Sequence, residues 1–245
     1  MADDTTENSS PTQPEITPEL LWSKYSLIQH LLFWLIALGV WSSLHWLGST
    51  QERFTIPIWR YVAQVQSYGF TGDLAGDAVR GVLSGAVILL LILGSDVVVA
   101  RVKGQPAREQ ILRNSHLLPR SPRQQFIAFL VGTNAGIFEE LFFRGGLFTL
   151  LSLLLRSPEL AILVTAALFA LLHAPVQGWY STAWIFLVGV FLNLLLLYSG
   201  SYYAPIFCHV TVNLGNLFII PAFFDPGTAS DALPLTGYAD SPLSG

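Results

Sequence analysis

Charged side chains are almost absent from a long stretch of this chain. Between Gln125 and Pro221 only five residues are charged, and Glu139, Glu140 and Arg144 are three of them. The chain of 245 residues is 52% hydrophobic and 11% charged, with a mean hydropathy of +0.54. An ordinary soluble domain carries about 25% charged residues. The sequence therefore predicts an all-α fold, a polytopic bundle of transmembrane helices with a polar cavity inside it.

Apolar segments long enough to cross a bilayer, which takes about 20 residues, recur along the chain. We expect about six spans, with six to eight possible, because 125–174 can be divided in more than one way. The third begins near Gln125, and Gly145-Gly146 is where its helix is expected to break. Gly132 and Gly136 lie four apart in it, so a neighbouring helix can approach closely there. The other expected spans are 26–47, 78–100, 159–174, 182–199 and 203–221.

The polar parts of the chain suggest its domain organisation and orientation. Residues 1–20 are polar and acidic and are expected to be disordered, as is the tail 222–245; the membrane domain is 21–221. The loop 101–124 carries six of the twelve Lys and Arg residues. By the positive-inside rule it lies in the cytoplasm, and both termini then do as well. A nucleic-acid partner is not expected, because this loop sits between two spans.

The three charges inside the apolar stretch mark a candidate functional site. A charged side chain at the centre of a membrane helix costs about 2.5–3.5 kcal/mol, so these must face a protein interior or a wet cavity. Glu140 and Arg144 are four apart and can pair on one helical face. Glu139 lies about 100° round the helix from Glu140, which leaves its carboxylate free for chemistry. The alternative is a purely stabilising Glu–Arg cluster between helices.

Two further polar pairs lie on apolar helices later in the chain. Phe169 and His173 are four apart, and so are His209 and Asn213, so each pair faces one way. Taken alone, either histidine is more simply explained as a packing residue. Cys208 is the single cysteine, so an intrachain disulfide is excluded.

Three motifs occur in order along the chain: Glu139-Glu140…Arg144, Phe169…His173 and His209…Asn213. Together they resemble the motifs of the CAAX prenyl protease type II family, also called the CPBP or Abi family. The resemblance covers about residues 78–221. It implies an intramembrane endopeptidase acting on a peptide or a prenylated protein; in the eukaryotic branch the last three residues of a prenylated protein are removed. The short soluble parts are similar to bacterial members, which implies an integral protein of the bacterial inner membrane, in contact with lipid.

Peptide hydrolysis needs an activated water and a group that stabilises the oxyanion. Glu139 and His173 are expected to hold and deprotonate the water, while His209 and Asn213 donate hydrogen bonds to the oxyanion. Glu140, counted with the catalytic group, pairs with Arg144 and orients Glu139, and Phe169 shares the face of His173.

A metal-dependent mechanism would use three of the same residues. Glu139, His173 and His209 form a legitimate zinc set with one open position. The chain lacks His-Glu-x-x-His, and an Asn beside His209 fits the metal-free mechanism better. We therefore favour a glutamate-activated water without a cofactor and keep zinc as the alternative.

A second function class is a non-catalytic membrane protein, either a bacteriocin-immunity-type scaffold or a small transporter, in which the polar cluster binds a partner or an ion. One geometric condition separates the two classes. His173 lies at the end of the expected span 159–174, whereas Glu139 lies in mid-membrane. For these residues to meet, the span 159–174 must continue past Pro175, or the spans must tilt or break. A separation above about 12 Å among Glu139, His173 and His209 would exclude the catalytic hypothesis, because a base must reach its proton directly or through one water.

Overall fold

The computed structural model describes residues 73–224 without a gap, together with Phe70 and the pieces 28, 31–36, 38–39 and 42. The described part contains helices and no strand, which confirms the predicted all-α class. Its α-helices are α4 (Leu74–Lys103), α5 (Ala107–Ile111), α6 (Pro122–Glu140), α7 (Phe148–Leu155), α8 (Pro158–Ser199), α9 (Tyr203–Leu214) and α10 (Ile220–Phe224). A 3-10 turn, η2 (Ser115–Leu117), and two π-helical segments, η3 (Leu141–Leu147) and η4 (Gly215–Ile219), complete the set.

Four helical stretches among the described residues are long and apolar enough to cross a membrane: Leu74–Lys103, Pro122–Ser152, Pro158–Ser199 and Tyr203–Phe224. They cover every expected span except 26–47, most of which lies outside the described residues, as do the tail 1–20 and residues 225–245. The last helix continues to Phe224, a few residues past its expected end at 221. Large apolar side chains are exposed along these helices, for example Leu83, Leu90 and Leu187, as a lipid-facing surface requires.

The helix that carries the charged stretch does not break where the paired glycines suggested. It begins with a capping box, in which Ser121 accepts from the backbone of Gln124 and the Gln124 side chain reaches back. At Gly145 and Gly146 it changes to the π-helical segment η3, in which both glycines are buried, and then continues as α7. The expected break is therefore wrong, because tight packing around this segment keeps the backbone helical.

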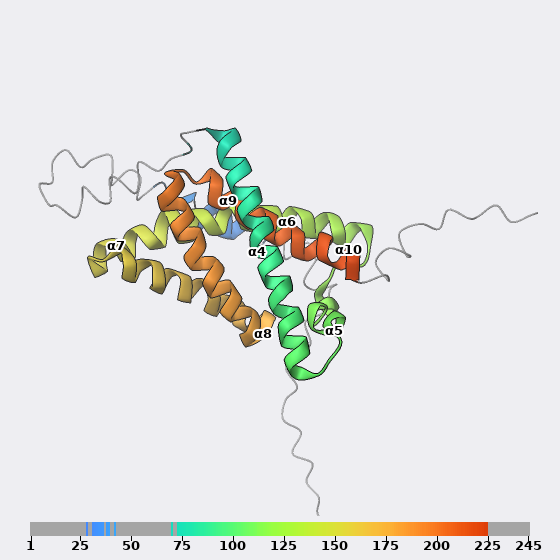
Figure 1. Ribbon diagram of the computed structural model, residues 1–245. Helices are drawn as coiled ribbons and strands as arrows, with labels where there is room; N and C mark the ends of the chain where they lie inside the picture. The colour runs from blue at the N-terminus through green and yellow to red at the C-terminus, as the bar shows by residue number, and fades with distance from the viewer. Residues whose placement is uncertain are drawn as a thin grey trace, which may run out of the picture.

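The long helix α8 reverses its direction at Gly178. The backbone there has φ 74° and ψ 166°, a conformation available essentially to glycine alone. The first half runs past Pro175 up to this residue, which is the condition set above for His173 to reach the other site residues. Figure 1 shows the second half, in orange, running back from the turn toward α9.

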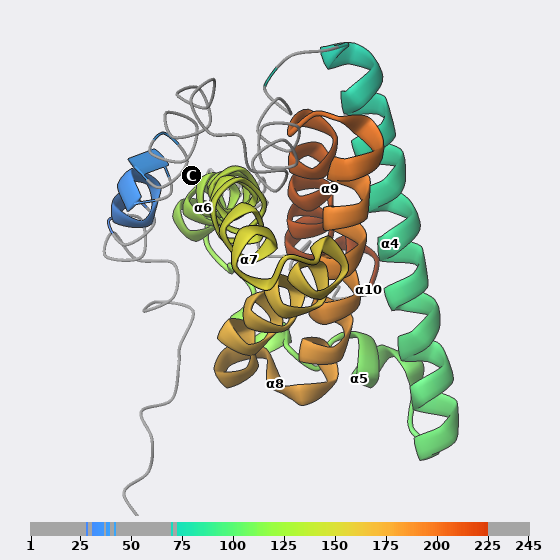
Figure 2. The same ribbon diagram turned by 90° about the vertical axis from the view of Figure 1, so that its left-hand side faces the viewer.

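Helix α9 lies between α4 and α6 (Figure 2), and small residues bring the three together. On α4, Gly81 lies against Ala204 and Gly85 against Thr211, so α4 and α9 run parallel. On the other side α6 runs antiparallel to α9. A Cβ on Gly136 would lie 2.5 Å from Val210, and one on Gly132 3.2 Å from Leu217, which confirms the predicted close approach. Residues that are far apart in the sequence are thereby held side by side at the centre of the bundle.

Candidate active site

Glu140 and Arg144 form the predicted ion pair, and both side chains are completely buried. Nη1 of Arg144 donates to Oε1 of Glu140 at 3.1 Å. The same oxygen lies 2.8 Å from Nδ1 of His209 on α9. Because an ionised carboxylate only accepts hydrogen bonds, Nδ1 of His209 carries the proton in this contact. One carboxylate thus joins two of the three motifs.

Arg144 has partners that the sequence analysis missed. Its Nη2 donates to the backbone oxygen of Gly189 at 3.1 Å, and Nδ2 of Asn193 donates to the same oxygen at 2.9 Å. Asn193 is a buried amide inside the apolar run of α8. A single amide in an apolar helix is a signal that could have identified Asn193 from the sequence, because a polar side chain inside the membrane costs free energy and therefore usually has a partner. The Gly189 carbonyl, a backbone group, leaves no such mark in the sequence.

Glu139 faces another way from its neighbour and meets open space. Its side chain is 18% exposed, against 0% for Glu140. Its Oε2 lies 3.7 Å from Nε2 of His209 and makes no hydrogen bond within the described residues. The expected turn of about 100° between successive helical residues thus separates a buried structural carboxylate from one that opens into a cavity.

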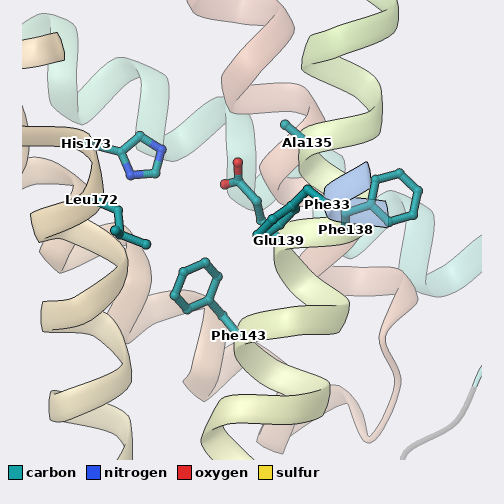
Figure 3. A pocket seen from close by; sticks show the side chains of 7 residues that line it. All are labelled: Phe33, Ala135, Phe138, Glu139, Phe143, Leu172 and His173. Carbon is teal, nitrogen blue, oxygen red and sulfur yellow. The ribbon is translucent and has the colours of Figure 1, made fainter. Parts of the chain in front are cut away.

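His173 approaches Glu139 from the first half of α8. Its Nδ1 lies 2.8 Å from the backbone oxygen of Phe169, a group that only accepts, so the proton is on Nδ1 and a neutral ring carries its lone pair on Nε2. Figure 3 shows His173 and Glu139 pointing toward one another across a cavity that Phe143 and Leu172 also line.

Phe169 links the two histidines. Its ring is buried and lies edge-on to both imidazoles, with centroid separations of 4.9 Å to His173 and 5.7 Å to His209. The guanidinium of Arg144 lies over the same ring at 4.8 Å, a cation–π contact. The rings of the two histidines can therefore be separated by no more than the sum of the two centroid separations. Glu139, His173 and His209 accordingly gather around one space.

Asn213 lies one helical turn after His209. Its Nδ2 donates one hydrogen bond, at 3.1 Å, to the backbone oxygen of Gly132 on α6. A side-chain amide nitrogen has two hydrogens, so the second remains available. Asn213 and His209 line the same cavity, as the spacing of four predicted.

Two cavities meet at this cluster. The smaller, of about 320 Å³, is mostly apolar and is lined by Phe33, Phe138, Phe143 and the residues common to both. The larger, of about 450 Å³, also touches His209 and Asn213 and extends to the α5–η2 region. Ala135, Glu139, Leu172 and His173 line both.

The metal alternative requires Glu139, His173 and His209 to converge on one point. Within the part of the chain that the structure describes, no group of three or more His, Cys, Asp or Glu side chains is arranged to hold a metal ion. Each histidine uses Nδ1 in a hydrogen bond, so Nε2 is the ring nitrogen left for another partner.

Comparison with known proteins agrees with the resemblance drawn from the motifs. Residues 122–215 match the family described as Type II CAAX prenyl endopeptidase Rce1-like. The matched segment runs from the start of α6 into the first residue of η4 and includes every candidate site residue. No curated protein and no solved structure matches the chain.

Proposed function

We propose that this membrane protein, whose residues 122–215 belong to the Rce1-like family of type II CAAX prenyl endopeptidases, hydrolyses a peptide bond with a water activated by Glu139 and His173. The family supports a peptidase of the CAAX type in a lipid bilayer. The roles of the individual residues and the absence of a metal are our proposal.

The reaction begins with a water between the Glu139 carboxylate and Nε2 of His173. Glu139 accepts one proton while the water oxygen adds to the carbonyl carbon of the substrate, and His173 accepts the second hydrogen of the water in a hydrogen bond. The protonated Glu139 then donates its proton to the amide nitrogen as the carbon–nitrogen bond breaks. The products are a carboxyl terminus and a free amine, so atoms and charges balance.

The oxyanion formed in that step needs donors, and His209 and Asn213 are proposed to supply them. Asn213 has an N–H left after its bond to Gly132. His209 donates from Nδ1 to Glu140, so it donates from Nε2 only as an imidazolium.

The observation that carries this proposal is the position of Glu139. It is the carboxylate of the motif that opens into both cavities, and Nε2 of His209 lies 3.7 Å from its Oε2. The rings of His173 and His209 flank the same Phe169 side chain. A site that served only to join helices would not require a carboxylate and a histidine to face open space together.

The test is cleavage of labelled membrane peptides, prenylated CAAX-type peptides included, by the purified protein and by Glu139→Gln. We expect Glu139→Gln to lower kcat at least about 10²-fold, the lower part of the range for loss of a general base. Glu159→Gln is the matched control, because Glu159 is an exposed carboxylate at the start of α8. Equal cleavage by the wild type and Glu139→Gln would remove the assigned role of Glu139.

Metal removal separates the two mechanisms. Activity of the wild type is expected to survive a strong chelator, because water activation is assigned to a carboxylate. Loss on chelation with recovery on adding zinc would instead support Glu139, His173 and His209 as metal ligands. Peptides that bind yet are cleaved by neither protein would favour the non-catalytic alternative.

A further inference from the structure

Asn193 is a polar side chain in an otherwise apolar part of α8. Every other residue of the segment 185–197 is apolar or glycine. The Asn193 side chain is completely buried and lines neither cavity, so a substrate does not touch it. A polar group at this depth costs free energy and marks a functional position by default. The hydrolysis described above gives it no role.

The amide of Asn193 and the guanidinium of Arg144 meet at one backbone oxygen. Nδ2 of Asn193 lies 2.9 Å from the Gly189 carbonyl oxygen, and Nη2 of Arg144 lies 3.1 Å from the same atom. The two halves of α8 approach closely here, because a Cβ on Gly189 would lie 3.1 Å from the Cβ of Ala166 and 3.4 Å from the Phe169 ring. The guanidinium lies over that same ring. The shared oxygen is therefore in a tightly packed place.

The Asn193 bond is an unusual one for a helix. In an α-helix, the backbone N–H of residue 193 is the ordinary donor to the Gly189 carbonyl, four positions earlier. A side chain that donates to the same carbonyl, as Ser and Thr sometimes do, competes with the backbone bond and often bends the helix. Such a bond has a local cost. The second side chain on this oxygen is Arg144, which indicates where a compensating gain would lie.

Arg144 connects this oxygen to the reacting groups. Its guanidinium is planar and rigid, so the acceptor of Nη2 determines where Nη1 points. Nη1 donates to Oε1 of Glu140 at 3.1 Å, and that oxygen lies 2.8 Å from Nδ1 of His209. Nε2 of His209 in turn lies 3.7 Å from Oε2 of Glu139. A shift in the acceptor of Nη2 would therefore reach the His209 ring through Arg144 and Glu140.

We propose that Asn193 is a positioning residue of the hydrolytic site. Its amide directs the Gly189 carbonyl toward Arg144, and Arg144 thereby keeps Glu140 against Nδ1 of His209. This role requires one hydrogen-bond donor aimed at the carbonyl four residues earlier. The effect on rate rests on the proposed function, whereas the effect on the His209 hydrogen bond does not.

Thr and Val at position 193 isolate that donor. The two side chains have nearly the same shape, so any space left by the smaller residue is the same in both variants. A helical threonine can donate to the carbonyl four residues earlier, as Thr182 does to Gly178 at 2.9 Å in this protein. Asn193→Thr should therefore keep most of the wild-type kcat. We expect Asn193→Val to lower kcat about 3–10-fold relative to Asn193→Thr, the range for one neutral hydrogen bond.

The value of KM and the thermal stability separate positioning from support of the fold. KM should be equal in the two variants, because Asn193, Gly189 and Arg144 line neither cavity. Oδ1 of Asn193 makes no hydrogen bond within the described residues, so the midpoint of unfolding in detergent should not fall when the amide is removed. Thr182→Val is the matched control, since it removes the same kind of bond from the same helix away from Arg144, and it should leave kcat unchanged.

Proton NMR of the full chain with isotope-labelled histidine observes the site without a substrate. The Nδ1–H of His209 and its acceptor on Glu140 are both buried, which protects this proton from exchange with water. His209→Gln identifies the signal by its loss. We expect the signal in the wild type and in Asn193→Thr, and its broadening or loss in Asn193→Val.

The outcomes for the two proposals are distinct. Equal kcat in the Thr and Val variants overturns the role of Asn193, and so does a His209 signal that persists in Asn193→Val. A fall in kcat that is matched by a lower unfolding midpoint in Asn193→Val would make the residue purely structural. If Asn193→Val does not fold, Asn193→Ala also lacks the donor and should show the same losses. A wild type that cleaves no peptide while the His209 signal responds as expected counts against the hydrolysis and leaves the positioning role intact.

Discussion

Glu139 and Glu140 are adjacent in the sequence and differ in almost every physical respect. Glu140 is completely buried and accepts hydrogen bonds from Arg144 and His209, which connects α6 and η3 to α9. Glu139 opens into the cavities and has spare accepting capacity. At the scale of single residues, the fold therefore uses one carboxylate to hold the site together and leaves the other available for a ligand.

The Arg144 side chain provides a stability prediction at this scale. Arg144→Met would leave the Glu140 carboxylate buried without its cation, and such losses cost about 3–5 kcal/mol. We expect a markedly lower midpoint of thermal unfolding in detergent. The double variant Glu140→Gln/Arg144→Met should recover part of the loss, because it leaves no unpaired buried charge. A single variant that unfolds at the wild-type temperature would contradict the assigned pairing.

The residue pairs were predictable from the sequence because a spacing of four puts two side chains on one face of a helix. This is why Glu140–Arg144, Phe169–His173 and His209–Asn213 could each be proposed as a unit. Contacts between elements were not predictable in the same way. The bond from Arg144 to the Gly189 carbonyl joins positions that come together only when α8 folds back at Gly178.

At the scale of helices, α6 and α9 meet through a glycine contact that sets the site geometry. A Cβ at Gly136 would lie 2.5 Å from a Val210 side-chain carbon and 2.9 Å from the Val210 backbone nitrogen. Backbone atoms cannot move aside without moving the helix. Because Glu139 and Glu140 lie within one turn of Gly136, and His209 is next to Val210, the close approach also determines the distance from Glu140 to His209.

Gly136→Ala should therefore lower both stability and activity. Overpacking of this kind costs about 1–3 kcal/mol, and pushing α6 away from α9 weakens the 2.8 Å contact between Glu140 and His209. Thermal unfolding and peptide cleavage measure the two effects. Gly94→Ala is the control, because nothing lies within 4 Å of its Cβ position on α4. It should hold stability or raise it by about 0.5–1 kcal/mol.

At this scale the sequence predicted the positions of helices better than their shape. Long apolar runs indicated where helices lie, and the four stretches observed agree with them. The glycine pair Gly145-Gly146 suggested a break that packing overrides. The actual reversal occurs at Gly178, after a proline that the helix passes through, so local signals alone did not identify it.

At the scale of the molecule, the loops fall into two groups. Arg113 of the basic region contacts Ser181 near the α8 turn, and Arg108 donates to the Phe224 carbonyl at the end of α10. Phe70 packs on Tyr202 and Tyr203 in the second group of loops, where the chain passes from α8 to α9. The fold therefore has one basic end, close to Arg113 and the larger cavity, and from the positive-inside rule we predict that this end faces the cytoplasm.

Cysteine labelling tests that orientation. Arg123→Cys places an exposed cysteine at the start of α6, and Glu159→Cys places one at the start of α8. The continuous helix α6–η3–α7 runs between these two positions. One crossing between them predicts that a membrane-impermeant maleimide labels Arg123→Cys only from the cytoplasmic side and Glu159→Cys only from the other. Cys208 is buried and should not compete. Labelling of both positions from the same side would require a different topology.

The π-helical segment η3 has a consequence for deletions. A π-helical turn holds one residue more than the α-helix that would otherwise fill the same length. Loss of one residue between Glu140 and Phe148 could thus be absorbed by a return to α-helix, with α6 and α7 keeping their places against their neighbours. What would change is the position of Arg144 and Phe143 relative to Glu140. The additional residue therefore determines where Arg144 lies relative to Glu140, and a shorter protein without it would still have a helix there.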